Sequence, residues 1–286
     1  MPQPGQVRIV TDSTSDLPPE VRERYGIVTV PLSIQFGSDS YRDNQDLTPA
    51  EFYRKQDEAE FPTTAQPSAG AFEEAYRRLH TEGASGVLCL CFSSKLSGTY
   101  NSAVLAAQTV GDEFPTEVID TQTATMGLGF LVIEAAKKAE AGASLDECAA
   151  RVRELMPHLE LVFVLNTLEF LAAGGRISKA KSLMGSVLSI KPLLKFEHGQ
   201  LEPFQQPRTR AKALDALVQW VFSIPDPAKV GVFHDGTPET LPEAHAIVER
   251  LSAKIPRDRI SVGFYGTTYG VHLGPKASGA VVLKKL

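Results

Sequence analysis

The sequence has few of the features that mark membrane, secreted, metal-binding or nucleic-acid-binding proteins. It contains three cysteines in 286 residues, and their spacing matches no usual zinc pattern. No apolar run is long enough to span a bilayer, and residues 1–6 carry no signal-peptide core. The formal charge of −5 gives no basic footprint for nucleic acid. We therefore expect a cytoplasmic protein that binds neither metal nor nucleic acid and whose cysteines are reduced core residues.

Common catalytic and nucleotide-binding motifs are also missing. No Gly-x-x-x-x-Gly-Lys-Ser/Thr segment occurs, which argues against an autonomous P-loop nucleotide site. Gly127 and Gly129 are not a dinucleotide fingerprint, because Val132 takes the third glycine position and the pair lies inside a predicted helix. Ser94 does not stand in Gly-x-Ser-x-Gly, the usual setting of an acyl-hydrolase nucleophile. We predict no cofactor.

Length and composition predict a globular protein of two domains. A chain of 286 residues exceeds the usual single-domain range, and 43% hydrophobic with 22% charged residues is ordinary for a soluble protein. Pro157 stops a helix that Ser144 caps, and a different pattern follows it. We therefore place the domains at residues 1–157 and 158–286.

The N-terminal domain alternates short apolar strands with helices. Strands are predicted at residues 7–10, 27–32, 87–91 and 117–119, helices at 68–80, 101–109 and 124–141, and a polar surface excursion at 34–46. This alternation predicts a three-layer α/β/α domain with a mainly parallel sheet. The strand ends near Thr11, Ser93 and Thr121 should share one rim of the sheet, where open α/β folds bind ligands.

Two hydroxyl-bearing segments are candidates for a binding site. Residues 92–100 join a strand to a helix and gather hydroxyls and backbone N–H groups that suit an anion, so we interpret them as the head-group end of a ligand site. The alternative is that Ser97 or Thr99 caps the helix. Residues 61–68 hold two prolines five apart, which keep the backbone extended and fix the direction of nearby hydroxyls. A rigid linker is the alternative there.

Asp12, just past the first strand, is either an acid in a mechanism or, more commonly, a turn-forming residue.

The C-terminal domain reads as a smaller α/β domain with a mixed sheet. Strands are predicted at 159–165, 188–196, 201–206, 229–233 and 260–264, and helices at 168–173, 208–222 and 242–254, with a further apolar helix that ends near residue 188. Gly174 and Gly175 let the chain reverse, so that Arg176 projects from a turn with a fork suited to a carboxylate or phosphate. A solvated arginine is the alternative.

Basic residues and one histidine complete the candidate site. Arg208, Arg210 and Lys212 oppose a helix dipole, which indicates either a docking surface for an anionic partner or a solvated face. His272 lies in the glycine-rich residues 266–275, where it could donate to an anion, act as a base or bond only to backbone.

The motifs, taken together and in order, resemble the DegV family of bacterial fatty-acid-binding proteins over essentially the whole chain. They are Val10-Thr11-Asp12-Ser13 followed by Asp16-Leu17, Phe61-Pro62-Thr63-Thr64-Ala65-Gln66-Pro67-Ser68, Ser93-Ser94-Lys95-Leu96-Ser97-Gly98-Thr99, Gly174-Gly175-Arg176-Ile177 and His272-Leu273-Gly274-Pro275. The resemblance implies a DegV-like two-domain fold, with an α/β/α N-terminal domain and a smaller α/β C-terminal domain that covers the acyl tail. It also implies one buried long-chain fatty acid.

The resemblance further implies a lipid-binding subunit with no catalytic residues of its own. In the family, a separate fatty acid kinase phosphorylates the bound carboxylate to an acyl phosphate for phospholipid synthesis. The kinase is then the expected protein partner, and transient membrane contact for lipid exchange is compatible with this role.

Site residues carry over from the resemblance position by position. Thr64 and Ser94 match the hydroxyls expected to bind the carboxylate, and Arg176 matches an arginine that presents it to the kinase. The remaining candidates are Thr63, Ser93, Gly98, Thr99 and His272 near the carboxylate, and Arg208 and Arg210 on the partner-facing side. Ala65 replaces the usual Ser, and Lys276 follows Pro275 where Gly is typical. These departures bear on the exact hydrogen bonds rather than on the ligand class.

Two other functions use some of the same residues. A serine acyl hydrolase would use Ser94 as nucleophile and His272 as base, but no acid is assigned to orient the histidine. A polar small-molecule or phosphosugar-binding module would use the same rim without a lipid tunnel. A buried acyl chain contributes about 0.8 kcal/mol per methylene, which favours the lipid carrier.

Overall fold

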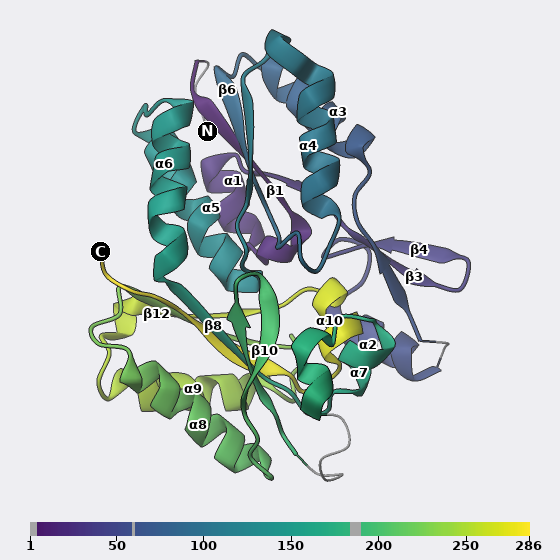
Figure 1. Cartoon of the computed structure of the whole chain (residues 1–286), viewed down its shortest axis with the longest axis vertical. Coiled ribbons are helices and arrows are strands. Elements are labelled where there is room, and N and C mark those ends of the chain that lie inside the picture. The colour runs from purple at the N-terminus through teal and green to yellow at the C-terminus, as the bar shows by residue number, and fades with distance from the viewer. Residues whose placement is uncertain (1–4, 59–60, 184–189) are drawn as a thin grey trace. The chain divides into compact units, whose positions relative to one another are not determined.

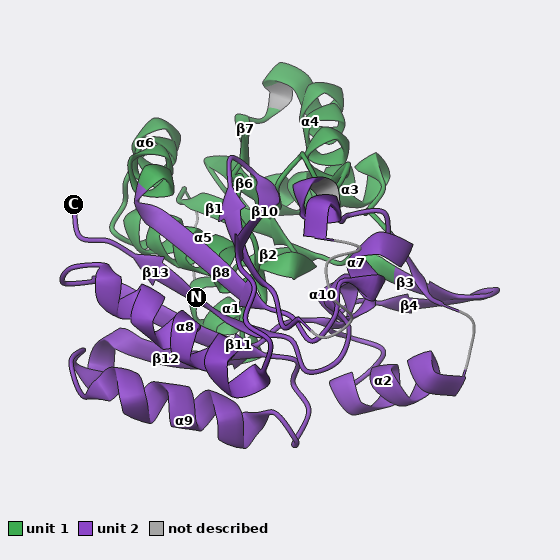
Figure 2. Ribbon diagram, turned by 60° about the horizontal axis from the view of Figure 1, so that its bottom comes forward, with its two compact units in different colours: residues 1–33, 65–157 green, residues 34–64, 158–286 purple. Residues whose placement is uncertain are grey.

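The computed structural model describes residues 5–58, 61–183 and 190–286 (Figure 1). These residues form two compact units, coloured separately in Figure 2. Unit 1 comprises residues 1–33 and 65–157, and unit 2 comprises residues 34–64 and 158–286. The mixed α/β class with one parallel and one mixed sheet, predicted from the sequence, is confirmed.

Unit 1 is built on a four-stranded parallel sheet with the order β2-β1-β6-β7. Its strands are β1 (Val7–Asp12), β2 (Val28–Val30), β6 (Gly86–Cys91) and β7 (Thr116–Asp120), and its α-helices are α1 (Pro19–Tyr25), α3 (Ala69–Thr81), α4 (Thr99–Val110), α5 (Thr125–Glu140) and α6 (Leu145–Leu155). Helices α3 and α4 pack on one face of the sheet and α5 and α6 on the other (Figure 1). This is the three-layer arrangement that strand-helix alternation predicts.

The core of unit 1 follows from the alternation of side chains along β6. Val87, Cys89 and Cys91 face α3 and α4, where they contact Phe72 and Tyr76 among others. All six residues of β6 are buried, as expected of a central strand in a parallel sheet covered on both faces. The prediction that the cysteines are core residues is confirmed, because all three cysteines of the chain are buried and free.

Local capping signals place the unit 1 helices. Ser68 accepts the N–H of Ala71 at the start of α3, and Ser144 with Glu147 forms a reciprocal capping box at the start of α6. Both helix starts are therefore where the sequence predicts them. No helix among the described residues combines the length and apolar character needed to cross a membrane.

Unit 2 is built on a six-stranded mixed sheet with the order β10-β9-β8-β13-β11-β12. Its strands are β8 (Leu159–Val164), β9 (Leu193–Glu197), β10 (Gln200–Gln205), β11 (Lys229–His234), β12 (Ile260–Phe264) and β13 (Ser278–Leu283), and its α-helices are α2 (Pro49–Glu58), α7 (Glu169–Ala173), α8 (Arg210–Ser223), α9 (Leu241–Ser252) and α10 (Thr267–Leu273). The β9–β10 hairpin is confirmed. Strand β13 and helix α10 were not predicted, although β13 lies at the centre of the sheet, between β8 and β11.

Residues 34–64 precede the domain boundary predicted at residue 157, yet they belong to unit 2. They contain α2, β4 (Asp39–Arg42), all but the first residue of β3 (Ser33–Phe36) and the start of β5 (Thr63–Ala65). The three strands form a small sheet of order β4-β3-β5. The expectation of a polar excursion at 34–46 is wrong at its start. Ile34 and Phe36 lie on one face of β3 and are buried against Phe52 and Val271. Two apolar residues on alternate positions point to the same face of a strand, and their burial is enough to hold this short strand in place.

The helix predicted to end near residue 188 lies partly outside the described residues. The described part, Ser178–Leu183, is a 3₁₀-helix.

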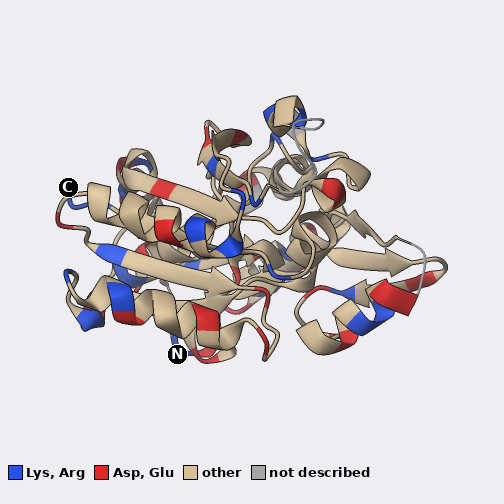
Figure 3. Ribbon diagram, turned by 90° about the horizontal axis from the view of Figure 1, so that it is seen from below, with Lys and Arg blue, Asp and Glu red and all other residues tan. Residues whose placement is uncertain are grey.

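Charges of both signs are interspersed along the ribbons in Figure 3, in keeping with the absence of a basic footprint from the sequence.

Asp12 joins the ends of β1 and β6 rather than standing free as an acid. The buried carboxylate accepts the N–H and the hydroxyl of Thr14 at 2.9 and 2.5 Å through Oδ1. Its Oδ2 accepts the N–H of Phe92 at 2.8 Å. The turn-forming interpretation of Asp12 is therefore confirmed.

We predict that Asp12→Ala lowers the free energy of unfolding by about 3 kcal/mol, because it leaves buried donors without an acceptor. Asp12→Asn should cost less, because the amide oxygen still accepts from Thr14. The measurement is chemical denaturation of both variants beside Asp112→Ala, which removes an exposed carboxylate. A loss for Asp12→Ala no larger than that of the control would contradict this role.

Candidate functional site

The carboxyl ends of three parallel strands bring the first group of predicted residues together in unit 1. The ladder pairs Thr11 of β1 with Leu90, and Cys91 of β6 with Asp120 of β7. The loop after β6 therefore starts beside the end of β7. Within unit 1, the predicted common rim of strand ends is present.

Ser94 is held at this rim by Asp120, a residue that sequence reasoning missed. The Ser94 hydroxyl donates to Asp120 Oδ2 at 2.5 Å, and the Ser94 N–H donates to Oδ1 at 3.1 Å. The N–H of Gln122 also donates to Oδ1, at 3.1 Å. A signal was available, because Asp120 ends the neighbouring strand just before Thr121. The bond fixes the Ser94 side chain in the loop between β6 and α4.

The start of α4 follows the capping alternative in part, since Ser97 is not the N-cap residue but bonds to the first N–H of the helix. The helix begins at Thr99 with Gly98 at the N-cap, and no side chain caps it at that position. The Ser97 hydroxyl instead accepts the N–H of Thr99 at 3.3 Å and lies 2.8 Å from the Thr99 hydroxyl. Gln66 lies against Gly98, where a Cβ would come within 2.5 Å of the Gln66 amide nitrogen. Ser93, which is buried, accepts the N–H of Lys95 at 3.3 Å.

Thr64 and His272 form the second group, in unit 2. Thr64 lies on β5 and His272 on α10, and Thr64 Oγ1 is hydrogen-bonded to His272 Nε2 at 2.9 Å although 208 residues separate them in sequence. Thr64 is half-buried and its neighbour Thr63 is exposed, as expected of adjacent positions on a strand. Of the two adjacent threonines in residues 61–68, Thr64 is therefore the one whose hydroxyl bonds to His272.

The absence of a side chain at Gly174 leaves room for the imidazole ring of His272. A Cβ at residue 174 would collide with the Nδ1 atom of the imidazole. Gly175 has a φ of +70°, so it makes the predicted left-handed turn, whereas Gly174 has a φ of −76° that any residue adopts. The two glycines of the motif therefore have different roles, and that of Gly174 is close approach to the histidine.

The environment of His272 keeps its imidazole neutral. Burial and then the positive charge of Arg176 lower the pKa of His272 to about 4. The Nδ1 atom is buried and has no hydrogen-bond partner among the described residues. Arg176 itself donates from Nη1 to the carbonyl of Gly174 at 2.7 Å. A neutral imidazole at pH 7 can donate or accept at Nε2, and it is a weak base.

The basic residues at the start of α8 differ in their surroundings. The Arg210 guanidinium is paired with both carboxylate oxygens of Glu243, with 3.0 Å between Arg210 Nε and Oε2, and it donates to the hydroxyl of Ser278 at 2.7 Å. Glu243 therefore compensates the charge of Arg210 within unit 2. Arg208 is exposed.

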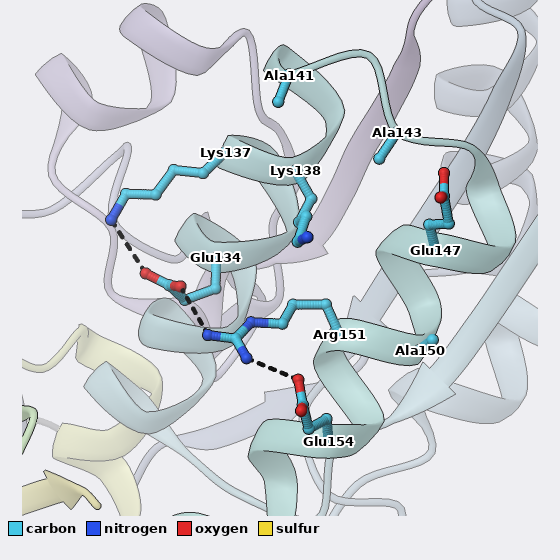
Figure 4. A pocket seen from close by; sticks show the side chains of 9 residues that line it. All are labelled: Glu134, Lys137, Lys138, Ala141, Ala143, Glu147, Ala150, Arg151 and Glu154. Carbon is cyan, nitrogen blue, oxygen red and sulfur yellow. Dashed lines mark hydrogen bonds and ion pairs between the residues drawn. The ribbon is translucent and has the colours of Figure 1, made fainter. Parts of the chain in front are cut away.

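A groove of about 820 Å³ lies between α5 and α6 in unit 1, away from these motifs (Figure 4). Its lining comes from the second half of α5, the connection after it and α6, whereas the rim of strand ends lies where α5 begins. Glu134 in the groove forms ion pairs with Lys137 and Arg151, and Arg151 also pairs with Glu154. Among the described residues, no cluster of His, Cys, Asp or Glu could hold a metal ion.

A parallel-sheet unit and a mixed-sheet unit define the class of this protein as a two-unit α/β protein. The family model DegV, described as an uncharacterised protein family, matches residues 6–285. The chain belongs to the DegV family. It is 35% identical to the DegV domain-containing protein SCO2569 of Streptomyces coelicolor over 279 residues, which cover 96% of this chain and 98% of that protein.

Solved structures of similar proteins share the fold. A DegV family protein from Thermus thermophilus, described as binding fatty acid, superposes with a TM-score of 0.89 at 34% identity and covers 98% of this chain and 100% of its own. DegV from Bacillus subtilis, described as a fatty acid binding protein, gives 0.87 at 30% identity with the same coverage. A stearic acid-binding protein from Eubacterium ventriosum gives 0.86 at 27% identity and covers 98% of both chains. These relatives bind fatty acids.

We predict that His272 titrates near pH 4, below the value of about 6.5 for a free histidine. Since the unfolded chain binds this proton more tightly, the contribution of His272 to stability is fully present above pH 6.5. It is lost as the pH falls from about 6.5 towards 4. NMR titration of the imidazole gives the pKa, and His272→Gln should flatten the pH dependence of unfolding in this window. A pKa of 6.5 or above would contradict the neutral state.

Proposed function

We propose that the protein binds one long-chain fatty acid, with its carboxylate hydrogen-bonded by Thr64 and Ser94 near His272. The Ser94 hydroxyl then turns from Asp120 to donate to the ligand. The observation that carries the proposal is the Thr64–His272 hydrogen bond, which joins two motifs that are far apart in sequence. The supporting comparison is the fatty acid binding described for relatives that share the fold over nearly the whole chain. Ser93, Gly98 and Thr99 supply further hydroxyls and N–H groups at the rim of unit 1.

The chemistry of these groups suits an anion that must leave water. An ionised carboxylate is costly to bury without donors, and hydroxyls with a neutral imidazole supply donors without a second buried net charge. The tail supplies the affinity, since each buried methylene contributes about 0.8 kcal/mol. The hydrolase alternative is weaker, because a histidine with a pKa of about 4 is a poor general base.

We further propose that the protein is not itself an enzyme and presents the bound acid to a separate fatty acid kinase in the cytoplasm. The resulting acyl phosphate would serve phospholipid synthesis, and lipid exchange would involve transient membrane contact. Arg176 is the presenting residue, because its charge lies close to His272 and its guanidinium fork suits carboxylate or phosphate. Arg208 is an exposed cation just before α8 and is proposed to face the kinase. Arg210 is paired with Glu243, so we propose that it supports this surface rather than binding the partner directly.

We predict that purified protein yields about one equivalent of fatty acid on organic extraction, identified by mass spectrometry. Thr64→Val and Ser94→Ala should each reduce the retained lipid about tenfold, because a hydrogen bond to a charged group is lost. Thr63→Val is the matched control, since it changes the exposed neighbour on the same strand. Recovery of a polar ligand in place of lipid would favour the small-molecule module, and full retention by Thr64→Val would contradict the proposed site.

We predict that Arg176→Ala keeps the bound lipid and lowers acyl phosphate formation with the cognate kinase about tenfold or more. The measurement combines extraction of the variant with a kinase assay on the loaded protein. Arg54→Ala, which removes an exposed cation from α2, is the control and should leave both quantities unchanged. Turnover by Arg176→Ala at the wild-type rate would exclude a presenting role.

A further inference from the structure

Residues 34–64 contact α10 at both ends, at its middle and at His272, all within unit 2. Asp43 reaches its N-terminal end, Phe52 its middle and Tyr53 its C-terminal end. Thr64 contacts His272 on the same helix. The first part of this segment, residues 34–46, was expected to be a surface excursion, and the proposed fatty acid site does not explain these other contacts.

The N-terminal end of α10 is capped from outside the helix. Gly266 occupies the N-cap and its own residue type provides no side chain for capping. The fully buried Asp43 supplies the acceptor instead, because its Oδ1 accepts the Thr267 hydroxyl at 2.9 Å and the Thr268 N–H at 3.0 Å. A carboxylate at this place also interacts favourably with the helix dipole. Asp43 therefore does for α10 what a capping side chain does in other helices.

Glycine allows the close packing around this cap. A Cβ at Gly266 would lie 2.5 Å from the side-chain nitrogen of Asn44, the residue after Asp43. A Cβ at Gly270 would lie 2.5 Å from Cε1 of Phe52, which is fully buried. The segment and the helix therefore approach each other more closely than side chains at residues 266 and 270 would permit.

The C-terminal end of α10 is held by tyrosine hydroxyls. The hydroxyls of Tyr53 and Tyr265 donate to the carbonyl of Gly274 at 3.3 and 3.2 Å. Burial raises the pKa of both phenols, so they remain protonated donors. Both ends of the helix are thus bonded to groups outside it.

A helix of this length depends on such contacts for its position. The seven residues of α10 make about two turns, which is too short to be stable alone. A slip by one residue moves a side chain about 1.5 Å along the axis, enough to break the 2.9 Å bond between Thr64 and His272. The direction of the imidazole therefore depends on the contacts that hold the helix in place, and the cap at its start is one of them.

We propose that Asp43 is a positioning residue for the fatty acid site, which acts by capping α10 and thereby holding His272 against Thr64. Asp43 does not touch the ligand in this role. The inference rests on the proposed function for its effect on lipid binding, whereas its effect on the histidine is independent of any ligand.

The test compares Asp43→Ala and Asp43→Asn with the wild-type protein after removal of lipid. NMR follows the titration of His272, and oleate is the probe for fatty acid affinity. Asp43→Ala should bring the pKa of His272 closer to 6.5, because the ring is no longer held in its buried place, and should weaken oleate binding about fivefold. Asp43→Asn keeps an acceptor oxygen and should restore both properties towards wild type.

Asp57→Ala is the matched control, because it removes an exposed carboxylate from α2, within the same segment as Asp43. It should change neither the titration nor the affinity. If Asp43→Ala does not fold, Thr267→Val removes only the hydroxyl bond and should shift both readouts in the same direction by less.

The outcomes separate the two proposals. A wild-type His272 titration and wild-type oleate affinity in the Asp43→Ala protein, or in Thr267→Val where Asp43→Ala does not fold, would overturn the positioning role. A shifted titration in a protein whose wild-type form binds no oleate would support the positioning role and contradict the proposed function. A loss of oleate affinity without any change at His272 would also overturn the role, because Asp43 would then act by another route.

Discussion

The hydrogen bond between Thr64 and His272 is the interaction on which the candidate site depends. It needs an extended strand that directs Thr64 and a short helix that directs His272, and a glycine at 174 leaves room for the ring. Burial and the charge of Arg176 keep the imidazole uncharged. Each of these conditions comes from a different part of unit 2, so the pair forms only when that unit is folded.

In unit 1 too, contacts between segments that are distant in sequence position the candidate hydroxyls. Parallel pairing puts the ends of β1, β6 and β7 on one rim, and two buried or half-buried carboxylates order the loops there. Asp12 holds the start of the loop after β6 through Phe92, and Asp120 holds Ser94. Both carboxylates accept hydrogen bonds from backbone N–H groups and hydroxyls, and in this way they stabilise the loops.

Much of the architecture could be predicted because its signals are local. The apolar run of β6, the caps at Ser68 and Ser144 and the glycine turn at Gly175 each act within a few residues. The predictions failed where a partner lay far away in sequence. Ile34 and Phe36 are a weak strand signal alone, and their buried partners include Phe52 and the distant Val271. Helix α10 has no cap of its own, because Asp43 supplies it.

The sequence by itself determined the alternation of strands and helices, the family and the residue types that can bind a carboxylate, because periodicity, capping and motifs are written along the chain. Only the tertiary structure decided that Thr64 rather than Thr63 meets His272, that Asp120 holds Ser94, and that residues 34–64 belong with unit 2. These outcomes depend on contacts between residues tens to hundreds of positions apart. Short-range pattern carries no information about them, since distance along the chain does not determine distance in space.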